Sequence, residues 1–250
     1  IIPVLPFYSP RSYVATWSNL KGYDNRWGII DSLPYMYFDG SHKGQESTTQ
    51  FVDSDTDWEE LNPLLQDDAS SSYISSLLME PILQMSPDYQ PLTTGLVESW
   101  EKINDSYFVF HMRKGVYWNP SYDVTQRDEG SGPLSEAPLM TGLKGEYSNG
   151  TNQEVTAKDA VFTYLVWANH ITSEDPQLYN WIKAIWVDPN DKYTFHLVID
   201  GVPDDPNDPD TLGLQPYAPF WTLLPVRILP EFFLNSTNTS VTYSSGGVRM

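Results

Sequence analysis

The sequence contains no cysteine among its 250 residues. That absence excludes a disulfide framework, a thiolate metal site and a cysteine nucleophile. Basic residues are scarce, because 14 Lys and Arg stand against 33 Asp and Glu, a formal net charge of −19. A field of this sign repels phosphate backbones, so we expect no binding to nucleic acid. No apolar run approaches the roughly 18 residues that a membrane-spanning helix needs.

Patterns of common catalytic and nucleotide-binding sites are missing as well. There is no G-x-S-x-G elbow, no phosphate-binding P-loop and no G-x-G-x-x-G turn. Carboxylates are abundant, but nothing in the sequence marks one pair of them as a glycosidase couple. We therefore expect that the protein is not an enzyme and that it needs no cofactor.

Metal sites find little support in the sequence. The four histidines show neither HxxH nor HExxH spacing, which argues against zinc. The run from Asp53 has the 1-3-5 acidic spacing of a calcium loop, but Trp58 stands where Gly is wanted and Leu64 where a bidentate Glu is wanted. The acidic run at residues 204–210 is interpreted as a solvated turn, with a surface calcium ion as the alternative. The expectation is no metal site.

What the sequence has in excess is aromatic side chains: 9 Trp, 16 Tyr and 10 Phe, together 14% of the chain. Such a content is typical either of a large β-rich core or of a surface that grips ligands. The core is the better interpretation, because most aromatic residues in any fold serve packing.

Strand and helix patterns alternate irregularly along the chain. Residues 97–112 predict a β-hairpin with a turn at 104–106, in which Phe108, Phe110 and Met112 point inward. Residues 184–199 predict a second hairpin, and short strands are expected in 6–14 and 48–55. Helices are predicted in 62–83 and in 155–170, the latter with Thr156 and Asp159 as a capping pair. The mixture is an α+β fold without the regular βαβ rhythm of a parallel sheet.

Four glycosylation sequons lie in polar, turn-like contexts. Together with the absence of cysteine they favour an extracellular or cell-surface protein. The acceptor residues are Asn104, Asn149, Asn235 and Asn238.

Four stretches resemble, in the same order, motifs of the family 5 extracellular solute-binding proteins, the oligopeptide-, dipeptide- and nickel-binding receptors that feed ABC transporters. The first two are LNPLLQDDASSSYISSLLMEPIL (61–83) and PLTTGLVESWEKINDSYFVFHMRKGVYW (91–118). The others are VTAKDAVFTY (155–164) and the pair YTFHLVI and APFWTLLPVRILPEFF (193–199 and 218–233). Between the second and the third, residues 119–152 form an insertion relative to the family.

The resemblance implies a periplasmic-binding-protein-like lobe I, with a β-rich main subdomain and a smaller α/β subdomain. Residues 2–23 resemble the family's last segment, which returns to complete this lobe, so the chain either spans a junction between tandem receptor units or has a permuted order. The implied division is a returning segment (1–40), a linker (41–47), the main subdomain (48–85 and 182–250) and the smaller subdomain (86–181). The second lobe of the family is expected to be missing from this chain.

By this resemblance the protein would capture a peptide or another small solute between two lobes and deliver it to an ABC permease at the membrane, from a membrane-anchored parent. The implied ligand contacts are Tyr8, Tyr13, Trp17, Asn62, Pro63 and Trp221. The alternative is a glycosylated structural or adhesive surface protein that keeps the fold and self-associates.

Overall fold

The computed structural model describes residues 14–51, 56–86, 88, 90–118, 154–202, 205–208 and 212–234. The chain divides into two compact units, residues 1–56 and 57–250. Helices and strands are both present, so the predicted α+β class is confirmed. No helix among the described residues has the length and apolar character needed to cross a membrane.

The first unit is a small two-stranded sheet with one helical connection. Strand β1 (Leu20–Lys21) pairs antiparallel with β2 (Tyr37–Phe38), and α1 (Gly28–Ser32) with a 3-10 turn (Leu33–Tyr35) joins them. Gly22 has φ 81°, and a Cβ atom there would lie 1.8 Å from the Tyr35 carbonyl oxygen, so only glycine fits.

Residues 41–47, the predicted linker, are held within this first unit. The Asn19 side-chain amide donates to the Gly40 carbonyl and to Gln45 Oε1, both at 2.8 Å. The Trp17 ring lies 5.2 Å from the His42 ring. Of the strand expected in 48–55, residues 48–51 are not a strand, and residues 52–55 lie outside the described residues.

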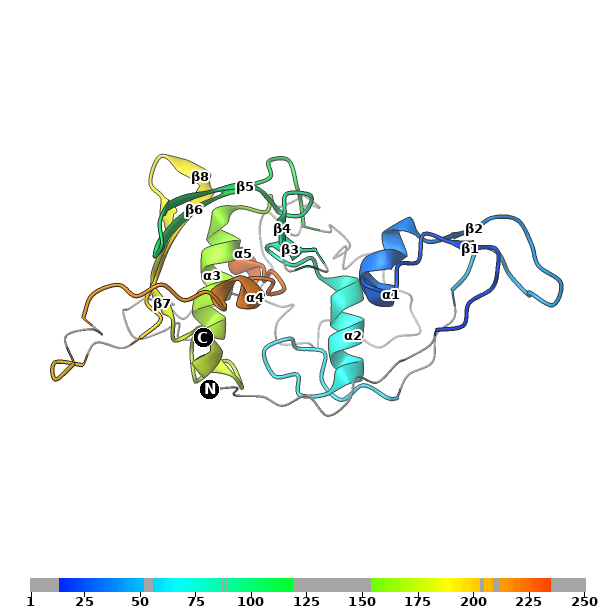
Figure 1. Cartoon of the computed structure of the whole chain (residues 1–250), viewed down its shortest axis with the longest axis horizontal. Coiled ribbons are helices and arrows are strands. Elements are labelled where there is room, and N and C mark those ends of the chain that lie inside the picture. The colour runs from blue at the N-terminus through cyan, green and yellow to red at the C-terminus, as the bar shows by residue number, and fades with distance from the viewer. Residues whose placement is uncertain are drawn as a thin grey trace, which may run out of the picture. The chain divides into compact units, whose positions relative to one another are not determined.

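The second unit is built on a four-stranded antiparallel sheet in the order β5-β6-β8-β7 (Figure 1). Both predicted hairpins are confirmed as its two halves. Their strands are β5 (Val97–Asn104), β6 (Tyr107–Met112), β7 (Ile182–Asp188) and β8 (Asp191–Ile199). Two short strands pair separately, β3 (Gln84–Met85) and β4 (Pro91–Leu92).

One face of the sheet, the inner face, forms the core. It consists of Phe108, Phe110 and Met112 of β6 and Phe195, Leu197 and Ile199 of β8, each at most 3% exposed. The period-2 alternation of the hairpin therefore predicted its buried side chains correctly. Opposite them, Tyr107, Val109, His111, Thr194, His196 and Val198 form the outer face.

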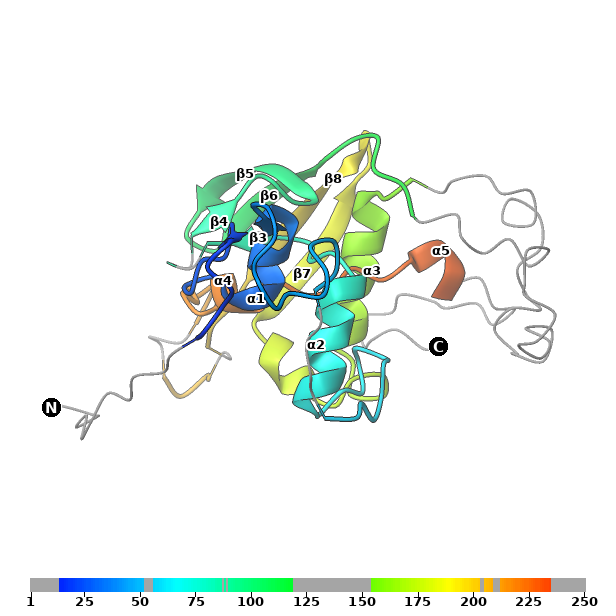
Figure 2. The same cartoon turned by 90° about the vertical axis from the view of Figure 1, so that its right-hand side faces the viewer.

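Helix α3 (Ala157–Trp167) covers the inner face and is shown beside the sheet in both views (Figures 1 and 2). Its predicted capping box is confirmed, with Thr156 and Asp159 bonding each other's backbone N–H groups. The Tyr164 hydroxyl donates to the Leu224 carbonyl oxygen at 2.7 Å, and the Thr163 hydroxyl accepts from the Leu229 N–H at 2.9 Å. Helix α3 thereby holds the segment that contains α4 (Phe220–Leu223) and α5 (Glu231–Leu234).

Of the helix predicted in 62–83, the structure confirms α2 (Ala69–Leu78) with Asp68 as its N-cap, whereas residues 62–68 and 79–83 are not helical. The buried face of α2 is not the apolar one. Ser71 and Ser75 are at most 3% exposed, whereas Leu77 and Leu78 are 45% and 72% exposed. The serine hydroxyls are buried because they bond the loop that precedes the helix. The apolar spacing thus predicted the helix and not the side that packs.

The sheet joins strands from 97–112 with strands from 182–199, which lie on either side of the predicted subdomain boundary at residue 181. Short segments far apart in the chain also pair, because Ile82 N–H donates to the Val226 carbonyl and Ile228 N–H to the Glu80 carbonyl. The division into a main and a smaller subdomain stays a prediction.

Candidate functional site

The predicted ligand contacts are distributed over both units. Tyr8 and Tyr13 lie outside the described residues. Trp17 belongs to the first unit, where its side chain is 44% exposed. Asn62, Pro63 and Trp221 belong to the second unit, and the structure places them in two different surroundings.

Asn62 and Pro63 lie in a turn of a loop that wraps the serine side of α2. The Asn62 Oδ1 accepts from the Leu64 N–H at 3.1 Å, and the Asn62 N–H donates to Glu60 Oε1 at 2.7 Å. This turn is therefore built by its own side chains, with the Asn62 side chain exposed.

The same loop is fixed to α2 by the buried serines. The Ser71 hydroxyl accepts from the N–H groups of Glu59 and Glu60, both at 3.1 Å. The Gln66 amide bonds the Ser71 carbonyl and the Ser75 hydroxyl. These contacts attach residues 57–67, which we call the acidic loop, to α2 through Glu59, Glu60 and Gln66.

Exposed side chains of two kinds alternate on the acidic loop. Trp58, Leu61 and Leu65 are 53%, 36% and 41% exposed. Exposed carboxylates come from Asp57, Glu59, Glu60 and Asp67. Because residues 44–101 contain no Lys or Arg, no neighbour in sequence neutralises them. Such a loop suits a ligand that carries positive charge together with apolar groups.

Trp221 lies elsewhere, among the aromatic side chains of the core. Its ring is 4.8 Å from Trp100 and 5.5 Å from Phe108, both in edge-on geometry, and it is half-buried. This environment is the packing of α4 on the sheet. As a ligand contact Trp221 stays a prediction.

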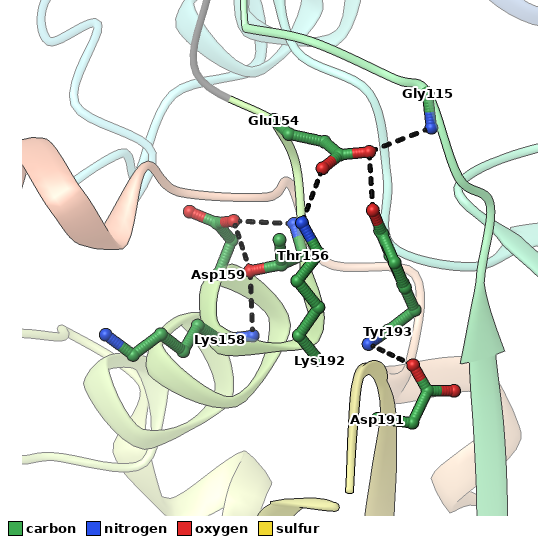
Figure 3. Close-up of polar contacts among 8 residues, drawn as sticks. All are labelled: Gly115, Glu154, Thr156, Lys158, Asp159, Asp191, Lys192 and Tyr193. Atoms are coloured by element: carbon green, nitrogen blue, oxygen red, sulfur yellow. Dashed lines mark hydrogen bonds and ion pairs between the residues drawn. The ribbon is translucent and has the colours of Figure 1, made fainter. Parts of the chain in front are cut away.

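The segment that follows the first hairpin meets the start of α3 in a polar cluster around Glu154 (Figure 3). The Glu154 carboxylate accepts from the Gly115 N–H at 3.1 Å and from the Tyr193 hydroxyl at 2.7 Å, and it pairs with Lys192 Nζ at 2.7 Å. Glycine suits position 115 because its φ is 72°. Tyr117 and Glu154 also form an antiparallel bridge, so the cluster joins the residues that flank 119–153.

The same cluster gathers cationic groups over one ring. Lys114 Nζ lies 5.1 Å and Lys192 Nζ 4.8 Å from the centroid of Tyr193, within the range of a cation–π interaction. Hydrogen bonds from Lys192, Tyr193 and Gly115 lower the pKa of Glu154 to about 2. The Glu154 carboxylate is therefore ionised at neutral pH. Because its oxygens already accept hydrogen bonds from Gly115, Lys192 and Tyr193, we assign it a structural role.

We expect Glu154→Gln to be less stable than the wild-type protein at neutral pH, by an amount that shrinks on acidification. The pKa of Glu154 falls from 4.5 in the reference state to about 2 in the fold, so its stabilisation is full above pH 4.5 and is lost as pH falls towards 2. Urea unfolding of both proteins at pH 7, 4.5 and 3 measures this. A difference that does not depend on pH would contradict the assignment.

A second carboxylate is buried at the start of α3. Asp159 is 3% exposed and accepts from the N–H groups of Thr156 and Glu231 at 2.8 and 2.9 Å. Burial raises the pKa of Asp159, and the nearby Glu231 charge adds to the effect. Because its carboxylate bonds the backbone at Thr156 and at Glu231, Asp159 holds the start of α3 against the start of α5.

Of the predicted glycan acceptors, only Asn104 lies within the described residues. It is exposed at the end of β5, and its Oδ1 accepts from the Ser106 N–H at 2.9 Å. Asn149, Asn235 and Asn238 lie outside the described residues. Among the residues placed by the structure, no group of three His, Asp or Glu side chains could hold a metal ion.

Comparison of the structure with solved structures finds similar proteins. The periplasmic binding protein DppA of Helicobacter pylori, solved with a peptide, is 20% identical over 74% of this chain and 32% of its own, with a TM-score of 0.44. The oligopeptide-binding protein AppA of Bacillus subtilis, solved with a nonapeptide, is 17% identical over 72% and 27%, with a TM-score of 0.45. NikZ of Campylobacter jejuni, solved with Ni(L-His), is 14% identical over 76% and 28%, with a TM-score of 0.45.

DppA is described as an ABC transporter-associated periplasmic binding protein, and AppA as an oligopeptide-binding protein. They are of the class that the sequence motifs resemble, and this chain spans about a third or less of their length. No model of a protein family matches the sequence. The search of curated proteins gives no match either.

Sequence reasoning missed Trp58, Leu61 and Leu65 as exposed side chains. The sequence did contain one indication that these side chains are exposed. They alternate with carboxylates in residues 44–101, which contain no Lys or Arg. The Glu154 cluster had no such signal, since Gly115 and Lys192 lie 39 and 38 residues from Glu154 along the chain.

Proposed function

We propose that this chain contributes one lobe of an extracellular solute-binding protein that captures a peptide for uptake by an ABC transporter. The supporting observation is that the four motifs, which are separated in sequence, bond to one another in the second unit. The 79–83 segment pairs with 226–228, α3 bonds Leu224 and Leu229, and the two hairpins share one sheet. A chance likeness of four short stretches does not predict that they form one core.

The proposed recognition surface of this lobe is the acidic loop with the Asn62–Pro63 turn. It is attached to α2 through Ser71 and Ser75, and it exposes Trp58 beside carboxylates. A loop held in this way loses little conformational entropy when a ligand binds. The chemistry favours peptides that carry Lys or Arg together with apolar side chains.

The test is a thermal-shift screen of the full-length parent protein against basic, neutral and acidic pentapeptides. We expect stabilisation by the basic, apolar peptides, because binding to the native state raises the unfolding temperature. Trp58→Ser should weaken their binding by about tenfold, which corresponds to ~1.4 kcal/mol. Ile171→Ser is the matched control, since Ile171 is 71% exposed and lies outside the acidic loop.

Two outcomes would overturn the proposal. If no peptide shifts the unfolding temperature while the parent protein forms assemblies, the structural or adhesive function is the better account. If peptides bind and Trp58→Ser binds as well as Ile171→Ser, capture does not use the acidic loop.

A further inference from the structure

The outer face of the four-stranded sheet carries a group of aromatic and ionisable side chains that the proposed capture of solute does not use. Helices α3 and α4 pack on the inner face of the sheet. Tyr107, Trp186, His196 and Asp188 lie together on the outer face, at the end of the sheet where β7 is the edge strand.

Trp186 is held in place by the residue next to it in the sheet. It pairs with His196 across β7 and β8, and the two rings are parallel within 8° with centroids 4.9 Å apart. The His196 ring cannot turn freely, because Nδ1 is 2.7 Å from the Tyr107 hydroxyl and Nε2 is 2.9 Å from Asp188 Oδ2. One face of the Trp186 indole is thus covered by a fixed imidazole.

Trp186 lies on the edge strand of the sheet, where Tyr107 is a second ring neighbour with its centroid 6.1 Å away. In the order β5-β6-β8-β7 no strand of the described residues follows β7. Trp186 is accordingly 38% exposed although it lies in the middle of a strand. An edge strand also presents backbone N–H and C=O groups that can bond an added strand.

The charge at this position is negative. Asp188 follows Trp186 by two residues on the same side of β7, and its hydrogen bond from His196 lowers the pKa of its carboxyl, which keeps it ionised at neutral pH. The basic residue of β7 itself, Lys183, pairs with the buried carboxylate of Asp200 at 3.1 Å. The protein as a whole has a net charge of −19.

We propose that the edge strand β7, with the Trp186 indole and the Asp188 carboxylate, is a docking site for an extended basic segment of a partner protein. The backbone of the segment pairs with β7, and an Arg or Lys side chain lies on the exposed part of the Trp186 indole. A cation over an indole gains from the ring's electron-rich face, most of all for Arg, and the neighbouring carboxylate adds attraction. The site is whole within the second unit, so it does not depend on a second lobe.

The test uses the 250-residue chain and a blocked heptapeptide of alternating Arg and Thr, with Gln and Glu in place of Arg in two control peptides. Binding is measured by isothermal calorimetry. We expect the Arg peptide to bind, the Gln peptide to bind about tenfold more weakly and the Glu peptide not to bind. An Arg peptide whose backbone nitrogens are methylated at alternate residues should lose affinity, because it cannot pair with β7.

Variants connect the binding to the proposed residues. Trp186→Leu should weaken binding of the Arg peptide about tenfold, and Asp188→Asn, which keeps an acceptor for His196, about fivefold. Ile171→Ser should leave it unchanged, because Ile171 is 71% exposed and lies outside both β7 and the acidic loop. Unfolding curves of each variant verify that it is folded.

Three results would overturn the inference. Equal affinity for the Arg and Gln peptides, or no effect of Trp186→Leu in a folded protein, removes the cation site. Concentration-dependent dimerisation that Trp186→Leu abolishes would show that the edge binds a second copy instead. Failure of the Arg peptide to bind the chain ends the proposal and leaves peptide capture by the parent protein untouched.

Discussion

Phe110→Ala is expected to lower the free energy of unfolding of the second unit by about 3–5 kcal/mol. Phe110 is 1% exposed on the inner face, stacked on Phe195 with ring centroids 5.0 Å apart and planes within 14°. Truncation removes this contact and leaves a cavity beneath α3 that close-packed neighbours fill only partly. Since domains are typically stable by 5–15 kcal/mol, a change of this size is a large fraction of the total.

Chemical denaturation followed by far-ultraviolet circular dichroism measures the effect. Ile103→Ala is the control on the same hairpin, because Ile103 is 53% exposed near the end of β5, and it should cost less than about 1 kcal/mol. A loss below 1 kcal/mol for Phe110→Ala would mean that the inner face is not the core of the protein in solution.

Asp159→Ala is expected to lower the free energy of unfolding by about 3 kcal/mol. The substitution leaves the buried N–H groups of Thr156 and Glu231 without their acceptor and removes half of the capping box of α3. Asp159→Asn retains one acceptor oxygen, so it should lose less.

The Asp159 carboxylate stabilises the fold by accepting hydrogen bonds and destabilises it when it is ionised while buried. The pH dependence of stability separates these two effects. Burial raises the pKa of Asp159 above its ordinary 3.8, so the folded state holds the proton more tightly than the unfolded state does. Ionisation therefore costs stability as pH rises past 3.8, and Asn bears no such cost. Relative to wild type, Asp159→Asn should gain stability between pH 3.5 and pH 6, measured by urea unfolding. A relative loss over that range would mean that Asp159 is stabilised as an anion.

The elements that could be predicted from sequence were those whose signals are local. The hairpin around Asn104 combines period-2 alternation with turn residues, and the α3 start combines Thr156 with Asp159 at the spacing of a capping box. In both cases the pattern and the stabilising interaction lie within a few residues of each other.

The elements that escaped prediction depend on side-chain contacts that the spacing of apolar residues does not encode. In α2 the apolar residues are exposed because the hydroxyls of Ser71 and Ser75 bond a loop, and counts of apolar spacing give hydroxyls no weight. The stack of Trp186 on His196 requires the register of β7 against β8. Of the candidate ligand contacts, the Asn62–Pro63 turn is exposed on the acidic loop, whereas Trp221 packs in the core.

The bridge between Tyr117 and Glu154 joins the chain just before residue 119 to the chain just after residue 153. Both segments are pinned by the Gly115–Glu154–Lys192 bonds, so the number of residues between them can change without moving β6, β8 or α3. The entropic cost of holding two points of a chain together grows only with the logarithm of the number of residues between them. Evolution, or a protein engineer, can therefore lengthen, shorten or replace this stretch at small thermodynamic penalty, while the scaffold that carries both proposed surfaces keeps its form.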